Sequence, residues 1–182
     1  MKKLLLLFVC LSLLAVSCGT SAPPVKPQQT EENNMLKITS SAFQANQPIP
    51  KKYTCQGDNI NPNLKIDGVP AAAKSLALIL HDPDAPREGG FTHWVVWNIP
   101  VQTSEISENS VPQGAVQGQN GAGKNTYIGP CPPTGSHRYY FYVYALDVNL
   151  DLRATTDKAG LEAAMDGHII DQGELMGTYQ KE

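Results

Sequence analysis

The segment His81–Pro100 reads HDPDAPREGGFTHWVVWNIP. It holds two aspartates among prolines, a Gly-Gly pair, and a histidine between a threonine and a tryptophan. Proline fixes φ at about −65°, and the apolar run VVW is typical of a buried strand. The segment therefore predicts a stiff polar loop between two strands. We interpret it as one wall of an anion-binding pocket.

A buried strand is predicted on the N-terminal side of this loop, where residues 74–82 read KSLALILHD. Its leucines alternate with Ala77 and Ile79, so two faces of a sheet are expected to be apolar. The same texture of short β-type runs between Pro, Gly, Asn and Asp continues through the chain. Further strands are expected at 36–43, 47–53 (a short edge strand), 64–66, 92–100, 137–147 and 174–180.

Helical periodicity is confined to the C-terminal part. Thr156 or Asp157 is a candidate N-cap. The apolar residues that follow at helical spacing are Leu161, Ala164, Met165 and Ile169. Residues 101–126 are poor in apolar side chains and are expected to be a long surface excursion. There is no internal repeat and no βαβ alternation, so the pattern is mainly β, with a sandwich or an open antiparallel sheet.

The N-terminus has the layout of a secretory signal. A basic start, MKK, precedes a mostly apolar run at 4–16, which is shorter than the roughly 20 residues of a membrane-spanning helix. The stretch LAVSC (14–18) resembles a bacterial lipobox. We therefore predict a lipoprotein signal peptide at 1–17 and a lipid on Cys18. The alternative is cleavage by ordinary signal peptidase, which would give a free secreted protein.

A tether is expected at 18–34, because this stretch is polar and contains three prolines. The folded domain would then be 35–182, held at the bacterial cell envelope on the periplasmic or surface side. The net charge is −3 and becomes about −5 once Lys2 and Lys3 are removed with the signal. A mildly acidic domain without a basic cluster argues against a nucleic-acid partner. The membrane contact is expected through the N-terminal lipid.

The chain has four cysteines, of which Cys55 and Cys131 lie in the predicted domain. In an exported protein these two are expected to pair as a disulfide, the alternative being two separate buried thiols. No histidine or cysteine spacing is typical of a zinc site. No metal and no cofactor are expected.

Several polar side chains are predicted to meet at one end of the sheet. If the strands at 74–82 and 92–100 pair, Asp82, Asp84 and His93 lie at the same end. His137 and Tyr139 open a third strand and share one of its faces. The alternatives are that the aspartates only form turns, that the histidines are structural and that Tyr139 belongs to the core.

These residues resemble the phosphatidylethanolamine-binding protein family, and the chain is more closely similar to its bacterial branch, the Raf kinase inhibitor-like proteins. The resemblance covers nearly all of 35–182. One departure is the sequence NGAG at 120–123, where many bacterial relatives have NDFG; Tyr127 is kept. The motifs that carry the resemblance are YTCQGDNINP (53–62), DPDAP (82–86), THW (92–94), VVWNIP (95–100), GPCPPTGSHRY (129–139) and GHIIDQGELMGTY (167–179).

The resemblance implies a large antiparallel sheet packed on a smaller one, with short C-terminal helical elements. It also implies a small cavity for phosphate-like anions or phospholipid headgroups, and a cis bond between Ala85 and Pro86. Carried over by motif, the cavity would be lined by Asp82, Asp84, His93, His137 and Tyr139, with Gly129 and Pro130 at its rim. A protonated imidazole pair would suit this role, because both ring nitrogens donate and a nearby carboxylate raises the pKa.

The function expected from these features is non-catalytic binding of a small anion, a phospholipid headgroup or a phosphorylated peptide at the cell envelope. One alternative is an inhibitor of a kinase or protease that acts through residues 101–126, with a protein partner or a homodimer. A second is an enzyme that uses Asp82 with His93, or Asp84 with His137, as an acid–base pair.

Overall fold

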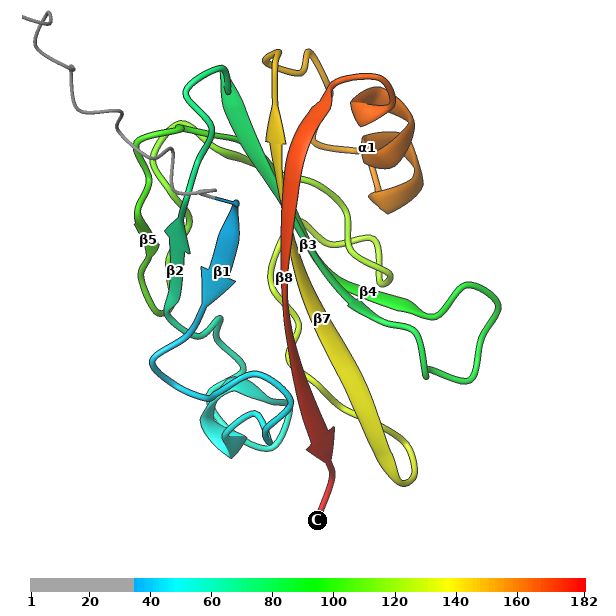
Figure 1. Cartoon of the computed structure of the whole chain (residues 1–182). Helices are drawn as coiled ribbons and strands as arrows, with labels where there is room; N and C mark the ends of the chain where they lie inside the picture. Colours follow the sequence, from blue (N-terminus) through cyan, green and yellow to red (C-terminus); the bar gives the residue numbers. More distant parts are fainter. Residues whose placement is uncertain (1–34) are drawn as a thin grey trace, which may run out of the picture. The chain divides into compact units, whose positions relative to one another are not determined.

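The structure is a computed structural model, and it describes residues 35–182 (Figure 1). The predicted signal peptide, Cys18 and the tether lie outside the described residues. None of the helices in the described part is long and apolar enough to cross a bilayer. The elements in order are β1 (Lys37–Thr39), η1 (Lys51–Tyr53), β2 (Leu64–Asp67), β3 (Ser75–Asp82), β4 (Phe91–Ile99), β5 (Glu105–Ile106), β6 (Val116–Gln117), β7 (Ser136–Leu146), α1 (Lys158–Met165) and β8 (Ile169–Gln180).

Strand β3 lies at the centre of the larger sheet, which has five strands in the order β6-β4-β3-β7-β8. All of its strand pairings are antiparallel. The alternation in 74–82 is confirmed: Leu76, Leu78 and Leu80 face one core cluster, and Ala77 and Ile79 face another. A strand that is apolar on both faces can be stable only when both faces are covered.

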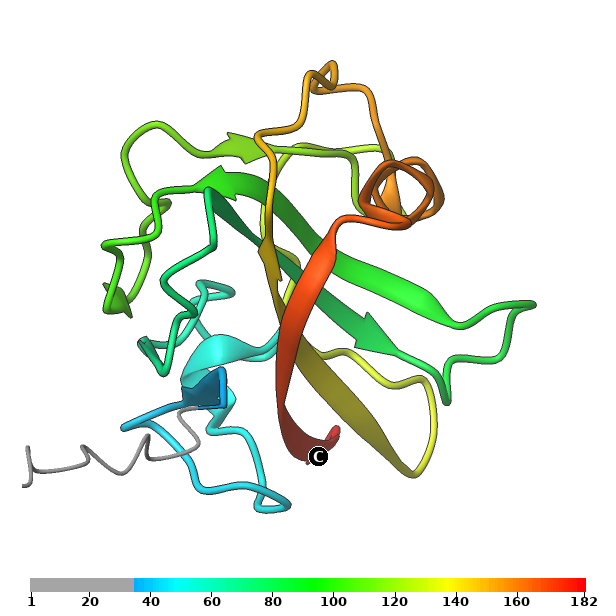
Figure 2. The same ribbon diagram turned by 45° about the horizontal axis from the view of Figure 1, so that its top comes forward.

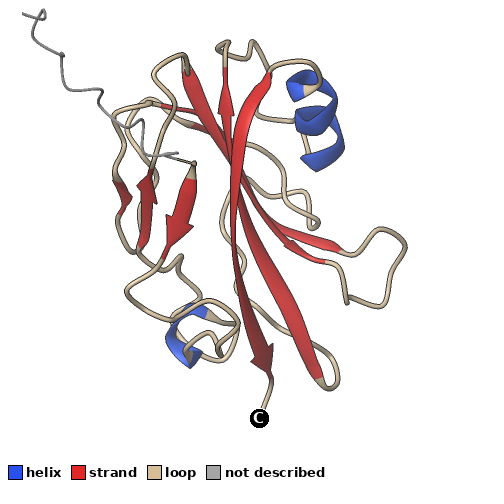
Figure 3. Ribbon diagram, viewed as in Figure 1, coloured by secondary structure: helices blue, strands red, loops and turns tan. Residues whose placement is uncertain are grey.

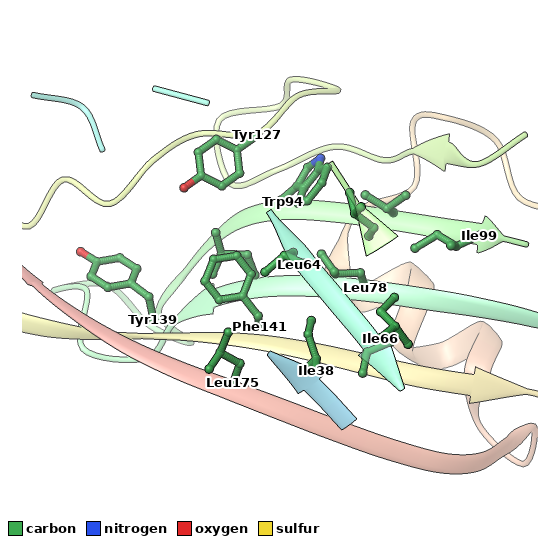
Figure 4. Packing of buried hydrophobic residues seen from close by; sticks show 14 of the residues in the cluster. Ile38, Leu64, Ile66, Leu78, Trp94, Ile99, Tyr127, Tyr139, Phe141 and Leu175 are labelled. Carbon is green, nitrogen blue, oxygen red and sulfur yellow. The ribbon is translucent and has the colours of Figure 1, made fainter. Parts of the chain in front are cut away.

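The smaller sheet, β1-β2-β5, covers one face of the larger sheet (Figure 3). The core between the sheets includes Ile38 and Ile66 from the small sheet and Trp94 and Phe141 from the large one (Figure 4). These side chains are at most 2% exposed, and each is worth about 1.5–3 kcal/mol of burial. The expected fold, a large antiparallel sheet packed on a smaller one, is confirmed.

Helix α1 covers the other face of the large sheet (Figure 2). It begins after Asp157, whose carboxylate accepts a hydrogen bond from the Gly160 N–H, so Asp157 rather than Thr156 is the N-cap. Leu161 and Met165 are its buried residues. Within residues 35–182, α1 is the sole α-helix, and the expected C-terminal helical elements reduce to it.

Two local expectations were wrong. Residues 47–53 form no edge strand: Pro48 makes one isolated bridge to Thr178, and η1 follows. The prolines in this segment have no N–H to donate to a ladder. The segment 101–126 is not only a surface excursion, because β5 and β6 add to the two sheets and Ile106 is buried in the core.

Candidate anion-binding site

A cavity of about 350 Å³ lies where β3 ends and where β4 and β7 begin. This volume falls within the range of small-molecule sites. The consecutive strands β3 and β4 therefore meet here with β7, which comes much later in the chain. The lining residues are Asp82, Ala85, Pro86, Arg87, Phe91, His93, Ile128, Gly129, Cys131, Pro133 and His137.

The loop between β3 and β4 folds back on Asp82, the last residue of β3. The Asp82 carboxylate accepts a hydrogen bond from the Asp84 N–H at 2.8 Å, and Gly90 closes the loop at a φ of 71°. A Cβ at Gly90 would meet the Asp82 carbonyl at 2.3 Å, so only glycine fits there. The expected cis bond between Ala85 and Pro86 is wrong: no peptide bond in residues 35–182 is cis, in line with the trans preference of most X–Pro bonds.

Asp82 and His137 form a buried pair in the wall of this cavity. The His137 Nδ1 lies 2.8 Å from the Asp82 Oδ2, and the two side chains are 9% and 4% exposed. An ionised carboxylate has no proton to donate, so the proton of this hydrogen bond is carried by the His137 Nδ1. The second carboxylate oxygen is already bonded to the loop, and the pair therefore joins the loop to β7.

His93, like His137, uses its Nδ1 atom for a hydrogen bond within the protein. Its Nδ1 donates to the Ile128 carbonyl at 2.7 Å, and the ring lies edge-on to both Phe91 and Tyr139. Burial lowers the pKa of His93 to about 4, against an ordinary value of 6.5. The charge of Asp82 does raise the pKa of this imidazole, as expected, but the loss of solvent around the ring outweighs it and the net shift is downward.

Asp84 lies outside the lining, contrary to expectation. Its carboxylate accepts hydrogen bonds from Arg138 at three positions, the backbone N–H, Nε and Nη2, at 2.9, 2.9 and 2.6 Å. These bonds from Arg138 hold the pKa of Asp84 at about 2. The carboxylate–histidine pairs expected for an acid–base enzyme, Asp82 with His93 and Asp84 with His137, do not form; the hydrogen bonds join Asp82 to His137 and Asp84 to Arg138.

Tyr139 lies at the edge of the cavity wall without lining it. It is fully buried, between His93 and His137, and its hydroxyl has no hydrogen-bond partner among residues 35–182. Burial, followed by the negative charge of Asp82, raises the pKa of this hydroxyl, so it stays protonated. Tyr139 is also part of the main core cluster, at the same end as Tyr127 (Figure 4).

The opposite wall of the cavity is fastened to the segment after η1. Cys55 and Cys131 are joined by a disulfide, with 5.4 Å between their Cα atoms. The Cys55 N–H donates to the carbonyl of Pro130, which does not line the cavity, and the Gly129 N–H donates to Asn59. A Cβ at Gly129 would meet the Tyr53 carbonyl at 2.5 Å, so glycine permits this close approach.

Seven lining residues were not among the predicted ligand-binding residues: Ala85, Pro86, Arg87, Phe91, Ile128, Cys131 and Pro133. Phe91 stands two residues before His93 on the same strand, and this period of two is a signal that would have found it. The Arg87 guanidinium lies over the Phe91 ring, 4.9 Å from its centroid. Nothing in the local sequence marks Ile128, because its hydrogen bond with His93 is made by its backbone carbonyl.

The segment 120–123, whose sequence NGAG departs from that of many bacterial relatives, packs against the Phe91 ring. The buried Asn120 accepts hydrogen bonds from the backbone N–H groups of Ala122 and Lys124. The Gly121 N–H donates to the Thr92 carbonyl, and a Cβ at Gly121 would meet the Phe91 ring at 2.8 Å. Small residues here allow the turn to pack against the cavity wall.

Known proteins share both the sequence and the arrangement. The sequence model described as phosphatidylethanolamine-binding protein matches residues 39–180. A UPF0098 protein of Methanothermobacter thermautotrophicus is 46% identical over 151 residues, which are 80% of this chain and 99% of that protein.

Solved structures of members of the same family are also similar to this chain. A homologue of phosphatidylethanolamine-binding proteins from Chlamydia trachomatis is 51% identical with a TM-score of 0.79, over 82% of this chain and 99% of that one. YbcL of E. coli, described as a member of the mammalian family, is 30% identical with a TM-score of 0.77, over 81% and 99% of the two chains. The chain therefore belongs to the phosphatidylethanolamine-binding protein family, within its bacterial branch.

Proposed function

We propose that this protein is a non-catalytic binding protein whose cavity takes a phosphate group, either as the free ion or as a small monoester such as a phospholipid headgroup. The observation that carries the proposal is the cavity itself, which is lined by the buried Asp82–His137 pair, by buried His93 and by the exposed Arg87. Family membership supports a binding role.

The size and lining of the cavity support a small ligand. A volume of about 350 Å³ accommodates a phosphate group and a short organic substituent. Phe91, Ile128 and Pro133 offer apolar surface for the substituent. Arg87 supplies a permanent positive charge, and guanidinium groups pair well with phosphate oxygens.

The lining also supports binding without turnover. Covalent catalysis needs a nucleophile next to a base. The residues that line the cavity include no serine, threonine or lysine, and the single cysteine among them is in the disulfide. Asp82 is itself engaged by two hydrogen bonds.

We further propose that a lipid on Cys18 holds the domain at the bacterial cell envelope. The lipobox-like stretch and the polar segment after it support this location. Expression in a bacterium fed a labelled fatty acid tests it. Label in the wild type and none in a Cys18→Ala variant is expected, with the variant recovered in the soluble fraction. An unlabelled wild type would contradict the anchor.

Isothermal titration of the full-length protein with inorganic phosphate, phosphoethanolamine and short-chain phosphatidylethanolamine tests the pocket. Binding of free phosphate alone would indicate the ion as ligand, and tighter binding of the esters would indicate a headgroup. Phosphorus NMR after the titration should show the esters unchanged. A folded protein that binds none of the three would contradict the proposal, and ester cleavage would contradict its non-catalytic part.

His168→Asn is a matched control for these titrations. His168 contacts Asp147 through Nδ1 at 2.9 Å, as His137 contacts Asp82, but at the opposite end of β7. His137→Asn should weaken phosphate binding and His168→Asn should leave it unchanged.

A further inference from the structure

The disulfide lies in one wall of the cavity. Cys131 lines the cavity, and its sulfur is bonded to that of Cys55, with a separation of 76 residues in the sequence. Both cysteines are exposed. A thiol in solution can therefore reach this bond, and exposed disulfides are in general the more easily reduced ones.

The wall that contains Cys131 has two halves, which are held in different ways. The first half, residues 127–130, is held by hydrogen bonds. The Tyr127 hydroxyl donates to the Tyr53 carbonyl at 2.8 Å, and Ile128 exchanges two hydrogen bonds with His93. These bonds do not involve sulfur, so they remain when the disulfide is broken.

The second half, residues 131–135, reads CPPTG. Its two prolines have no N–H, and none of the residues 132–135 makes a hydrogen bond to another residue of the described part of the chain. Pro132 is buried and contributes packing. The disulfide is the covalent bond that fastens this half to the segment after η1.

Breaking the disulfide therefore releases one half of the wall and leaves the other in place. The released half includes two lining residues, Cys131 and Pro133, and it leads into β7, whose second residue is His137. A ligand that binds to a mobile wall has to order it, and this entropic cost reduces the affinity. A wall that is already fixed carries no such cost.

We propose that the Cys55–Cys131 disulfide is a redox gate of the cavity: the oxidised protein binds its phosphate ligand, and the reduced protein binds the same ligand more weakly. This inference rests on the proposed function. It adds a control by the redox state of the surroundings.

The reductant of this gate is a dithiol. One of its thiolates attacks a sulfur of the disulfide, the S–S bond breaks, and a mixed disulfide forms. The second thiol of the reductant then displaces the protein sulfur. Two electrons and two protons pass to the protein, whose cysteines become thiols, and the reductant becomes a disulfide.

Binding and reduction are coupled in both directions, because they form a thermodynamic cycle. If reduction lowers the affinity about tenfold, saturating ligand lowers the equilibrium constant for reduction by the same factor. The coupling can therefore be measured on the wild type alone.

Isothermal titration of the full-length protein with inorganic phosphate and phosphoethanolamine, before and after reduction with dithiothreitol, measures the effect on binding. Reduction should lower the affinity about tenfold, because the released half of the wall has to be ordered. A second experiment equilibrates the protein with mixtures of reduced and oxidised dithiothreitol, with and without saturating phosphate. Mass spectrometry of the alkylated peptides that contain Cys55 and Cys131 should show the disulfide about tenfold harder to reduce when phosphate is bound.

The double variant Cys55→Ser with Cys131→Ser should bind like the reduced wild type and should not respond to dithiothreitol. Met165→Ala is the control for lost stability, because it truncates a buried side chain of α1, on the other face of the large sheet. This variant should keep the wild-type affinity. On reduction, the NMR order parameters of the Cys131 and Thr134 amides should fall from about 0.85 to about 0.6 or less.

The outcomes separate the two proposals. Equal affinity in the oxidised and reduced wild type, or a reduction equilibrium that phosphate leaves unchanged, would overturn the gate and leave the proposed function standing. Unchanged order parameters, a reduced protein that unfolds as a whole, or an equal loss of affinity in Met165→Ala would also overturn the gate, because the effect would not be local. A folded, oxidised wild type that binds neither probe would overturn both proposals.

Discussion

The His137 Nδ1 lies 2.8 Å from the Asp82 Oδ2, and both side chains are buried. The last residue of β3 is thereby bonded to the second residue of β7, across 55 residues of sequence. Since the loop N–H of Asp84 bonds to the same carboxylate, Asp82 organises one end of the sheet.

Asp82→Asn should lower the free energy of unfolding by about 1–3 kcal/mol, because it weakens two buried hydrogen bonds of a charged acceptor. Asp147→Asn is the matched control. Asp147 makes the same contact with His168, but those side chains are 48% and 44% exposed, so the change should stay within about 0.5 kcal/mol. Urea unfolding measures both, and equal losses would contradict the role of burial.

His93 should make stability depend on pH. Its pKa in the folded protein, about 4, is below its ordinary value of 6.5, so the unfolded chain binds the proton more tightly. The associated stability is present above about pH 6.5 and is lost as the pH falls through about 4, with a total on the order of 3 kcal/mol. Melting curves of wild type and His93→Asn from pH about 7 to about 4 check this. The variant should lose less stability over this window, and parallel curves would contradict the prediction.

Arg138→Met should loosen the loop at 83–90 while hardly changing global stability. The side chains of Arg138 and Asp84 are 51% and 28% exposed, so the loss of this pair should cost less than about 1 kcal/mol. Hydrogen exchange of the loop amides should become several-fold faster, because two of the three bonds to the Asp84 carboxylate are lost. Lys65→Met, which removes the exposed pair with Asp67, is the control and should leave this loop unchanged.

Arg87→Gln should weaken phosphate binding by about tenfold, because Arg87 is the sole lysine or arginine in the lining. The affinity should also become less sensitive to salt. Arg153→Gln makes the same change at an exposed position outside the lining and should have no effect. Titration at two salt concentrations checks both variants, and an unchanged affinity in Arg87→Gln would contradict the role of this charge.

Replacing both cysteines of the disulfide, Cys55→Ser with Cys131→Ser, should lower the free energy of unfolding by about 2–4 kcal/mol, because the bond closes a long loop with a separation of 76 residues. A reducing agent should have a similar effect on the wild type and none on the double variant. Urea unfolding with and without reductant measures this. A wild type indifferent to reductant would show that the cysteines are not paired.

The sequence by itself determined the strands that build the site. The alternation in β3, the apolar run in β4 and the aromatic run in β7 depend on side-chain periodicity, which is local. The capping aspartate of α1 could also be recognised, since a cap bonds within its own first turn. The motifs at 82–86 and 129–139 placed the chain in its family.

Only the tertiary structure decided which partner each polar group has. Asp82 and Asp84 are two residues apart and look alike in sequence, yet one is bonded to buried His137 and the other to exposed Arg138. That choice depends on how β3 and β7 pair along the sheet. The state of His93 depends on the carbonyl of Ile128, 35 residues away, and on the loss of solvent around the ring. A backbone carbonyl and the exclusion of water leave no mark on residue type, because both arise only when the chain is packed.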